Sequence, residues 1–227
     1  MFLFSELKPA TLRAMVQDKQ FIIIGPQGSG KGTQAKALAE RLGVPHISTG
    51  DMFRDNSARA TPLGVQAKVL IDRGVLVPDE LTNALVQARL AEADAASGFV
   101  LDGYPRNLRQ AEFLRTLAPG VKAIVLELSD QAAVERIAGR RVCAKCAAGY
   151  HLQFQPPLQA DVCDRCGGTL VQRSDDSEPV VRARLTTYHR TTEPLLDYYR
   201  GLGKLITIDG APAIVTVTKN LMQTLGL

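Results

Sequence analysis

A glycine-rich stretch near the N-terminus carries the residues best suited to chemistry. The sequence GPQGSGKGT runs from Gly25 to Thr33 and matches the phosphate-binding pattern G-x-x-x-x-G-K, with Thr33 after one further glycine. Glycines allow main-chain N–H groups to close around phosphate oxygens, and Lys31 adds a mobile positive charge. The stretch therefore predicts binding of a nucleoside triphosphate.

The flanking residues strengthen this prediction. The apolar run Phe21–Ile24 predicts a buried parallel strand, and Ala35, Leu38, Ala39 and Leu42 recur at the spacing of one helix face. A strand, a glycine loop and a helix in this order form the phosphate-binding element, whose helix N-terminus favours anions. The alternative, a glycine-rich turn in an ordinary α/β domain, does not require this order.

Several arginines are placed where a phosphate-binding cleft would need them. Guanidinium groups match phosphoryl oxygens in geometry and sign, and charge accumulates on those oxygens during phosphoryl transfer. A single arginine is more often a solvated surface residue, so their local context decides: they follow predicted strands or border the cysteine-bearing insertion. The six candidates are Arg54, Arg106, Arg136, Arg140, Arg173 and Arg184.

All four cysteines lie in one insertion, as the pairs Cys143-x-x-Cys146 and Cys163-x-x-Cys166, with sixteen residues between the pairs. Two such pairs can close a tetrahedral site, so we expect structural zinc; iron could bind the same thiolates. Two disulfides are the rival interpretation, which a reducing cytoplasm disfavours. His151 is nearby, but four sulfurs complete the tetrahedron, and we expect a packing or surface role for it.

Composition fits a polyphosphate-handling enzyme of one α/β domain. The chain has 227 residues, 45% of them hydrophobic, and a formal charge of +4, too mild to indicate a nucleic-acid partner by itself. No segment is long enough for a membrane span, and Glu6 and Pro9 interrupt the apolar start too early for a signal peptide. We therefore expect a cytoplasmic protein without a membrane or nucleic-acid partner. Residues 1–19 carry no motif and form either a short helix or a tail.

The order of apolar runs predicts an α/β fold with a doubly wound parallel sheet. Helical patterns separate the runs, and ligands of such sheets bind beyond the carboxyl ends of the strands. Residues 49 to 78 predict short helices, and residues 140 to 177 lack helical periodicity. The five predicted strands are Phe21–Ile24, His46–Ile47, Phe99–Asp102, Ala123–Leu128 and Leu205–Ile208.

Together these segments resemble adenylate kinase, in the long form whose lid carries a zinc module. The resemblance covers nearly the whole chain from Phe21 onward. Besides GPQGSGKGT it rests on ISTGDMFR at 47–54, GVLVPDE at 74–80, DGYPRNLRQ at 102–110, GRRV at 139–142 and RSDD at 173–176. Gln27 departs from the family, which often has proline there, and residues 1–19 have no family counterpart.

The resemblance implies a P-loop NTPase-type core: a five-stranded parallel sheet flanked by helices, with a helical insertion that binds the nucleoside monophosphate and a small β-rich lid that carries zinc. The core would comprise residues 1–48, 78–139 and 178–227, with the phosphate loop at 25–33; the insertion would be 49–77 and the lid 140–177. The implied reaction is MgATP + AMP ⇌ MgADP + ADP. The resemblance also implies that the enzyme is a monomer and serves adenine nucleotide homeostasis.

The resemblance also implies roles for individual residues. Asp102 would orient water around Mg²⁺, a hard ion that keeps part of its hydration shell. ATP would contact Gly28, Ser29, Gly30, Lys31, Gly32, Thr33, Arg136, Arg140, Gly149, Tyr150 and the Pro212 carbonyl. AMP would contact Thr49, Arg54, Val75, Leu76, Val77, Gly103, Tyr104, Pro105, Arg106, Gln110, Arg173 and Arg184. The catalytic set would be Lys31, Arg106, Arg140, Arg173, Arg184 and Asp102.

Two other functions compete. A UMP/CMP kinase would share the loop and the arginines but usually has a short lid, against which the long cysteine-bearing insertion argues. An ATPase with a nucleic-acid-binding zinc ribbon would need a basic, aromatic-rich module. The stretch from Cys143 to Cys166 has only Lys145 and Arg165 as cations and Tyr150 and Phe154 as aromatic residues.

Overall fold

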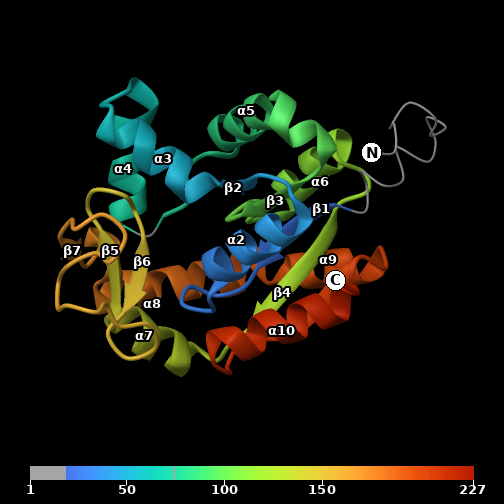
Figure 1. Ribbon diagram of the computed structural model, residues 1–227. Coiled ribbons are helices and arrows are strands. Elements are labelled where there is room, and N and C mark those ends of the chain that lie inside the picture. Colours follow the sequence, from blue (N-terminus) through green and yellow to red (C-terminus); the bar gives the residue numbers. More distant parts are fainter. Residues whose placement is uncertain (1–18, 74) are drawn as a thin grey trace, which may run out of the picture.

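The computed structural model describes residues 19–73 and 75–227, which form a parallel sheet between two layers of helices (Figure 1). The sheet order is β2-β3-β1-β4-β8, and all of its pairings are parallel. Its strands are β1 (Gln20–Ile24), β2 (His46–Ser48), β3 (Phe99–Asp102), β4 (Lys122–Glu127) and β8 (Leu205–Asp209). The predicted α/β fold is confirmed, and each predicted strand lies within one residue of its observed bounds.

Helices follow the strands in alternation, as the sequence predicts. The α-helices are α2 (Lys31–Leu42), α3 (Thr49–Ala58), α4 (Pro62–Asp72), α5 (Asp79–Leu90), α6 (Leu108–Leu117), α7 (Asp130–Ala138), α8 (Glu178–Thr187), α9 (Pro194–Gly201) and α10 (Ile214–Leu225). The described residues also form short turns of other helix types, which are η2 (Ala93–Ser97), η3 (Ser174–Asp176) and η4 (Tyr188–Thr192).

Strand β1 shows why the sheet is covered on both faces. Ile22 and Ile24 belong to one apolar core with residues of α5, α6 and α9. Phe21 and Ile23 belong to a second core with residues of α2 and α10. Because neighbouring residues of a strand point to opposite faces, a continuous apolar run fits a strand that is buried on both sides.

Two segments stand apart from this core. The first is the helical insertion, residues 49–77, in which α3 and α4 enclose a small core of their own around Phe53, Ala67 and Val77. Short helices were predicted here. Ser48 caps α3 by accepting from Asp51 N, and Thr61 caps α4 by accepting from Gly64 N.

The second segment is the cysteine module, residues 140–177. Its strands β5 (Arg140–Cys143), β6 (Gly149–His151) and β7 (Leu170–Val171) form an antiparallel sheet in the order β6-β5-β7. Helix α7 leads into the module and α8 leads out of it, and the two pack through Ala133, Ile137, Val181 and Leu185.

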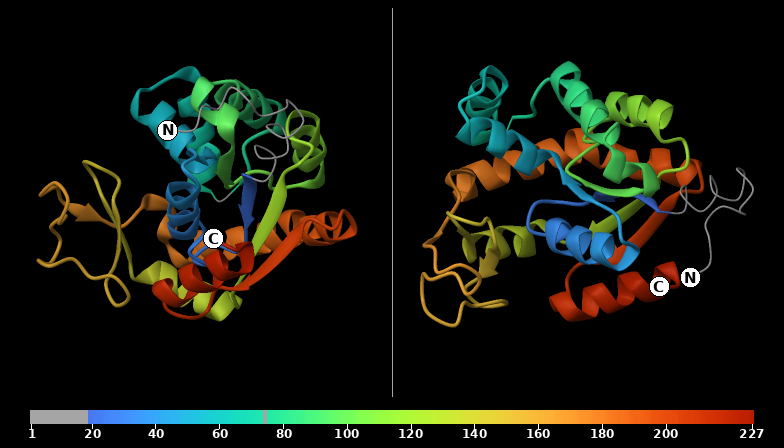
Figure 2. Two further views of the ribbon diagram at one scale, coloured as in Figure 1. Left: turned by 45° about the vertical axis from the view of Figure 1, so that its right-hand side comes forward. Right: turned by 45° about the horizontal axis from the view of Figure 1, so that its top comes forward.

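The helical insertion and the cysteine module lie at the same end of the molecule, beyond the sheet (Figures 1 and 2). A hydrogen bond joins them directly, because Ser174 Oγ donates to Asp72 Oδ1 at 3.1 Å. The two segments that interrupt the alternation in sequence therefore border the same space. The short helix or tail expected before Lys19 lies outside the described residues.

Candidate active site

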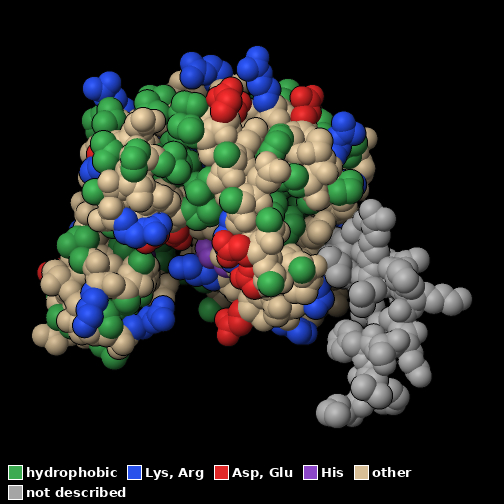
Figure 3. Space-filling model, turned by 90° about the horizontal axis from the view of Figure 1, so that it is seen from above, with side chains coloured by type: hydrophobic (Ala, Val, Ile, Leu, Met, Phe, Trp, Pro, Cys, Tyr) green, Lys and Arg blue, Asp and Glu red, His purple; other side chains and the backbone are tan. Residues whose placement is uncertain are grey.

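A cavity of about 990 Å³ lies between the sheet, the helical insertion and the cysteine module. This volume is at the top of the range for ligand pockets, which is roughly 300–1,000 Å³. The space-filling view in Figure 3 shows a hollow on this face with Lys and Arg side chains on its walls. A large cavity with basic walls suits more than one polyanionic ligand.

The phosphate loop between β1 and α2 forms the floor of the cavity. Gly25 has φ +149°, and a Cβ there would lie 2.5 Å from the carbonyl oxygen of Leu126. Gly28 has φ +86°, and its Cβ would lie 2.8 Å from the carbonyl oxygen of Ala133. Both positions exclude any larger residue. Helix α2 starts after Gly30 without a side-chain cap, so its first N–H groups are available to an anion.

Lys31 crosses back over this loop. Its Nζ donates to the main-chain carbonyls of Gly25 at 2.7 Å and Pro26 at 2.6 Å. Burial lowers the pKa of Lys31 to about 8, and the nearby carboxylate of Asp102 opposes that shift. A buried ammonium held only by carbonyls is poorly compensated, and a phosphate in the loop would supply the missing negative charge.

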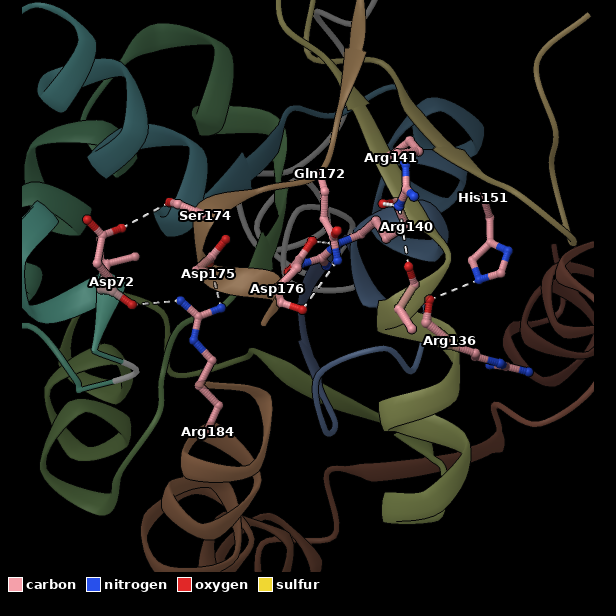
Figure 4. A network of polar contacts seen from close by, with 12 residues as sticks. Asp72, Arg136, Arg140, Arg141, His151, Gln172, Ser174, Asp175, Asp176 and Arg184 are labelled. Carbon is pink, nitrogen blue, oxygen red and sulfur yellow. Dashed lines mark hydrogen bonds and ion pairs between the residues drawn. The ribbon is translucent and has the colours of Figure 1, made fainter. Parts of the chain in front are cut away.

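Two arginines, each paired with an aspartate, line the wall formed by the cysteine module and α8 (Figure 4). Arg140 binds Asp176 with two nitrogens, Nε to Oδ2 at 2.8 Å and Nη2 to Oδ1. Arg184 Nη1 lies 2.6 Å from Asp175 Oδ2, and its Nη2 donates to the carbonyl of Ile71 at 3.0 Å. The buried aspartates hold both guanidinium groups at the cavity.

Arg173 has no such bond to a carboxylate of the described residues. Its pKa is lowered to about 10, first by burial and then by the like charges of Arg54 and Arg140. Arg54 in turn donates from Nη2 to Asp51 Oδ1 at 2.6 Å. Guanidinium groups that crowd Arg173 closely enough to lower its pKa are costly without a counter-charge, and a polyphosphate would provide one.

Asp102 ends β3 beside the phosphate loop. It lies opposite Ile23 in the sheet, and its Oδ2 is 3.2 Å from where a Cβ on Gly32 would stand. Its side chain is 15% exposed and lies 3.8 Å from His46 Nε2. A partly exposed carboxylate at the mouth of a phosphate loop is a suitable hard oxygen donor for Mg²⁺ or its water ligands.

The helical insertion and the segment after β3 form the opposite side of the cavity. Thr49 Oγ1 donates to the carbonyl of Gly103 at 2.9 Å, and Arg106 Nε donates to the same carbonyl at 2.7 Å. Gln110 is 2% exposed: its Oε1 accepts from Arg106 N at 2.7 Å and its Nε2 donates to Asp79 at 2.8 Å. These bonds fix the orientation of the amide and leave one further donor and acceptor position on it.

Tyr104 differs from the other residues expected around AMP. Its side chain is 1% exposed, packs in the core beneath the sheet, and donates to Asn83 Oδ1 at 2.6 Å. It is not among the residues that line the cavity. Its side chain therefore supports the wall from behind, and only its main chain is near the site.

Arg136 extends from α7 to the segment that follows β8, at the rim of the cavity. Its guanidinium donates to the carbonyls of Gly210 at 2.8 Å, Ala211 at 2.5 Å and, more weakly, Pro212 at 3.5 Å. The same guanidinium lies 5.6 Å from the centre of the Phe154 ring, a cation–π distance. The Pro212 carbonyl that was expected to meet adenine thus also accepts from an arginine.

The four cysteines form a compact tetrad, with all four sulfurs within 4.8 Å of one another. Cys143 and Cys166 sulfurs are 3.5 Å apart, and those of Cys146 and Cys163 are 3.6 Å apart. The two sulfurs of a disulfide bond are about 2.05 Å apart. Four sulfurs that each lie about 2.3 Å from one zinc ion are instead about 3.8 Å from one another. The cysteines are unpaired, and their arrangement fits a tetrahedral metal site.

Main-chain and phenol groups surround the tetrad. Lys145 N and Cys146 N point to Cys143 Sγ at 3.4 and 3.5 Å, and the Tyr150 hydroxyl lies 3.4 Å from Cys163 Sγ. His151 is not part of the group: its Nδ1 accepts from two main-chain N–H groups, so its Nε2 carries the proton and donates to the carbonyl of Arg136 at 2.9 Å. This is the packing role expected for His151.

The cavity brings together most residues that the sequence singled out. Those lining it are Gly28, Ser29, Gly30, Lys31, Gly32, Thr33, Thr49, Arg54, Val75, Leu76, Val77, Asp102, Gly103, Pro105, Arg106, Gln110, Arg136, Arg140, Gly149, Tyr150, Arg173, Arg184 and Pro212. Many other residues also line the cavity without a role predicted from the sequence, among them Gln27, His46, Phe154 and Asp175. Only Asp175 had a local signal, as a carboxylate beside two candidate arginines.

Comparisons with known proteins agree with this geometry. A family model described as adenylate kinase matches residues 23–204. The chain is 49% identical to an adenylate kinase of Streptomyces griseus over 91% of this chain and 97% of that one. It is 44% identical to one of Caldicellulosiruptor saccharolyticus over 92% of this chain and 99% of that one. This chain belongs to the adenylate kinase family.

Members of this family are phosphotransferases that move a phosphoryl group reversibly between ATP and AMP to give ADP, with Mg²⁺ bound to ATP. Such an enzyme must hold two nucleotides in one cavity, and the volume of about 990 Å³ allows this. Within the part of the chain that the structure describes, no helix is long and apolar enough to cross a membrane.

Proposed function

We propose that this adenylate kinase binds MgATP over the phosphate loop and AMP against the helical insertion, and transfers the phosphoryl group between them at Lys31. The position of Lys31 supports the proposal. Its ammonium lies on the loop, and the arginines of the module and of α8 line the same cavity. The donor phosphates would lie on residues 28–33, and AMP near Thr49, Arg54, residues 75–77, residues 103–106 and Gln110.

The reaction needs charge neutralisation rather than a general base. The acceptor is a phosphate oxygen, which is largely ionised at neutral pH because the second phosphate pKa is about 6. Two polyanions must be held in line against their mutual repulsion. Lys31, Arg106, Arg140, Arg173 and Arg184 would supply the positive charge that stabilises the equatorial oxygens of the transferred group.

Asp102 would hold the water shell of the magnesium ion that accompanies ATP. Its carboxylate reaches the mouth of the loop, beside Gly32. When bound, the ion shields the phosphate charges and orients them for in-line attack. The role of this protein residue is to fix the position of that shell relative to Lys31.

The cysteine module would act as a lid over ATP and the helical insertion as a cover over AMP. Residues 140–177 and 49–77 border the cavity from opposite sides, and residues 1–48, 78–139 and 178–227 would form the core. Transfer to AMP rather than to water requires closing the site around both substrates. Arg136, Arg140, Gly149 and Tyr150 would reach ATP from the lid side.

The four cysteines would bind one structural zinc ion. Their sulfur separations, and main-chain N–H groups directed at Cys143, support this assignment. A site with four thiolates has no open position for a substrate, so the metal would stabilise the lid and take no part in transfer. Free thiols of this kind suit a reducing cytoplasm. We further propose that the protein acts as a monomer.

A coupled assay with four acceptors tests the proposed acceptor site. We expect ADP formation from ATP with AMP to exceed transfer to GMP, CMP and UMP, because a fixed Gln110 amide reads one base edge and leaves unpaired groups with another. Comparable turnover of UMP would contradict the assignment of the AMP site.

A further inference from the structure

Buried polar atoms without partners are concentrated at this cavity. Among the residues that the structure describes, six buried side-chain polar atoms have no hydrogen-bond partner, and four of the six belong to Gln27, Ser29 and His46, which all line the cavity. Such atoms are rare in folded proteins because an unpaired buried polar group destabilises the fold. Their location indicates partners that come with the substrate.

Among these three residues, Gln27 has the most unpartnered atoms. Both its Oε1 and its Nε2 are buried and unpartnered, so a complete carboxamide lacks hydrogen bonds within the described residues. The role of this side chain is not explained by packing, because an apolar residue of the same shape would avoid the cost. A carboxamide offers two N–H donors, which match phosphate oxygens.

The position of Gln27 decides which phosphate it can meet. Lys31 Nζ donates to the carbonyl of Pro26 at 2.6 Å, and that carbonyl belongs to the peptide group whose nitrogen is that of Gln27. The main chain of Gln27 therefore lies next to the Lys31 ammonium, which would face the transferred phosphoryl group. Gly28, which follows it, cannot carry a side chain, since a Cβ there would lie 2.8 Å from a carbonyl oxygen of α7. Gln27 therefore brings two N–H donors to this bend of the loop.

We propose that the Gln27 carboxamide donates a hydrogen bond to an oxygen of the transferred phosphoryl group, as a further catalytic residue beside Lys31. This inference rests on the proposed placing of the phosphates on the loop. A donor at this point would act mainly on the transition state, where charge on the equatorial oxygens is greatest.

Gln27→Leu and Gln27→Glu in the full-length protein test the proposal, with steady-state kinetics for ATP and AMP and thermal unfolding of the nucleotide-free protein. Loss of one such donor should lower kcat of Gln27→Leu roughly 10- to 100-fold, with both KM values within about threefold of wild type. The melting temperature should not fall, because the variant removes an unpartnered amide. Gln27→Glu should be slower still, since its carboxylate repels phosphate oxygens.

Gln223→Leu, an exposed glutamine of α10, is the matched control and should behave as wild type. A kcat for Gln27→Leu within twofold of wild type would overturn the inference, as would a lower melting temperature or a rise in KM without a change in kcat. Lys31→Met separates the two proposals. If Lys31→Met is inactive while Gln27→Leu is normal, only the role of Gln27 fails; if Lys31→Met is fully active, the placing of the phosphates fails as well.

Discussion

The guanidinium of Arg136 donates to the main-chain carbonyl of Gly210 at 2.8 Å, which ties the helix that leads into the cysteine module to the loop after the last strand of the sheet. The same group reaches the Ala211 and Pro212 carbonyls. A nucleotide base that binds these carbonyls would compete with the arginine for them. An arginine released in this way would be free to cover the base from the end of α7.

Replacement of Arg136 should therefore affect ATP more than AMP. We expect Arg136→Ala to raise KM for ATP by roughly tenfold, the effect of one lost charged hydrogen bond, with KM for AMP nearly unchanged. Initial rates with each substrate varied in turn provide the measurement. Arg141→Ala is the control, because the Arg141 guanidinium donates to the carbonyls of Ala138 and Arg140 and lies outside the cavity lining. Equal changes in both KM values would argue against a role in ATP binding.

Gln110→Ala should have two separable effects. KM for AMP should rise more than KM for ATP, because the amide has one donor and one acceptor position left for a base edge. The protein should also lose about 1–3 kcal/mol of stability, since Arg106 N and Asp79 lose a buried partner. Denaturant unfolding and initial-rate kinetics measure the two. A stability loss with unchanged KM values would leave Gln110 with a structural role alone.

Nucleotide binding should take up a proton at alkaline pH. Burial lowers the pKa of Lys31 to about 8, so above this pH most of the protein carries a neutral lysine. Phosphate binds the protonated form and raises that pKa. Affinity for ATP should therefore fall by up to about tenfold per pH unit above pH 8. Calorimetry at pH 9 in two buffers of different ionisation enthalpy reports the proton uptake, and Lys31→Met should abolish it. The same uptake by Lys31→Met would assign it to another group.

Metal removal should loosen the cysteine module before the core. The module has a small apolar core, largely the cysteines with Ala148, Tyr150 and Leu170, whereas the sheet is buried on both faces. Chelation under reducing conditions should lower the melting temperature and increase hydrogen exchange first in residues 140–177. We expect about one zinc ion per chain. Fully active protein without bound metal, or unchanged melting of Cys143→Ser and Cys163→Ser, would contradict this.

His189 should make a small contribution to stability that depends on pH. Hydrogen bonds to Glu193 at 2.8 Å and Asp130 at 3.0 Å raise its pKa. The stabilisation is therefore present below pH 6.5 and is lost as pH rises through the raised pKa. Because the group is largely exposed, His189→Gln should cost at most about 1 kcal/mol at pH 5.5 and almost nothing at pH 9. Urea unfolding at both values checks this, and an equal cost at both would exclude a charge effect.

The spacing of apolar residues predicted the strands and helices of this fold, because the side chains that an element buries determine that spacing. The continuous apolar run around Ile22 marks a strand covered on both faces, and the spacing of Ala35 and Leu38 marks the inner face of α2. The cysteine spacing likewise predicted a tetrad, since each pair closes one tight turn. These features depend on residues that are close in sequence.

Contacts between distant segments were not predictable in the same way. Arg136 and Pro212 are 76 positions apart, and Arg184 and Ile71 are 113 apart. No local pattern records which carbonyl an arginine reaches. Tyr104 was expected at AMP by resemblance, yet its side chain lies in the core. The unpartnered amide of Gln27 became visible only when burial and hydrogen bonds could be evaluated together.

The central claim is that phosphoryl transfer between ATP and AMP takes place on the phosphate loop under the charge of Lys31. Phosphorus NMR of ATP and AMP incubated with the wild-type protein and with Lys31→Met tests it directly. The wild type should form two ADP for each ATP consumed, and the variant should be slower by about 10²-fold or more at saturating substrates, with an unchanged fold and metal content. Activity of Lys31→Met within a few-fold of wild type would contradict the account.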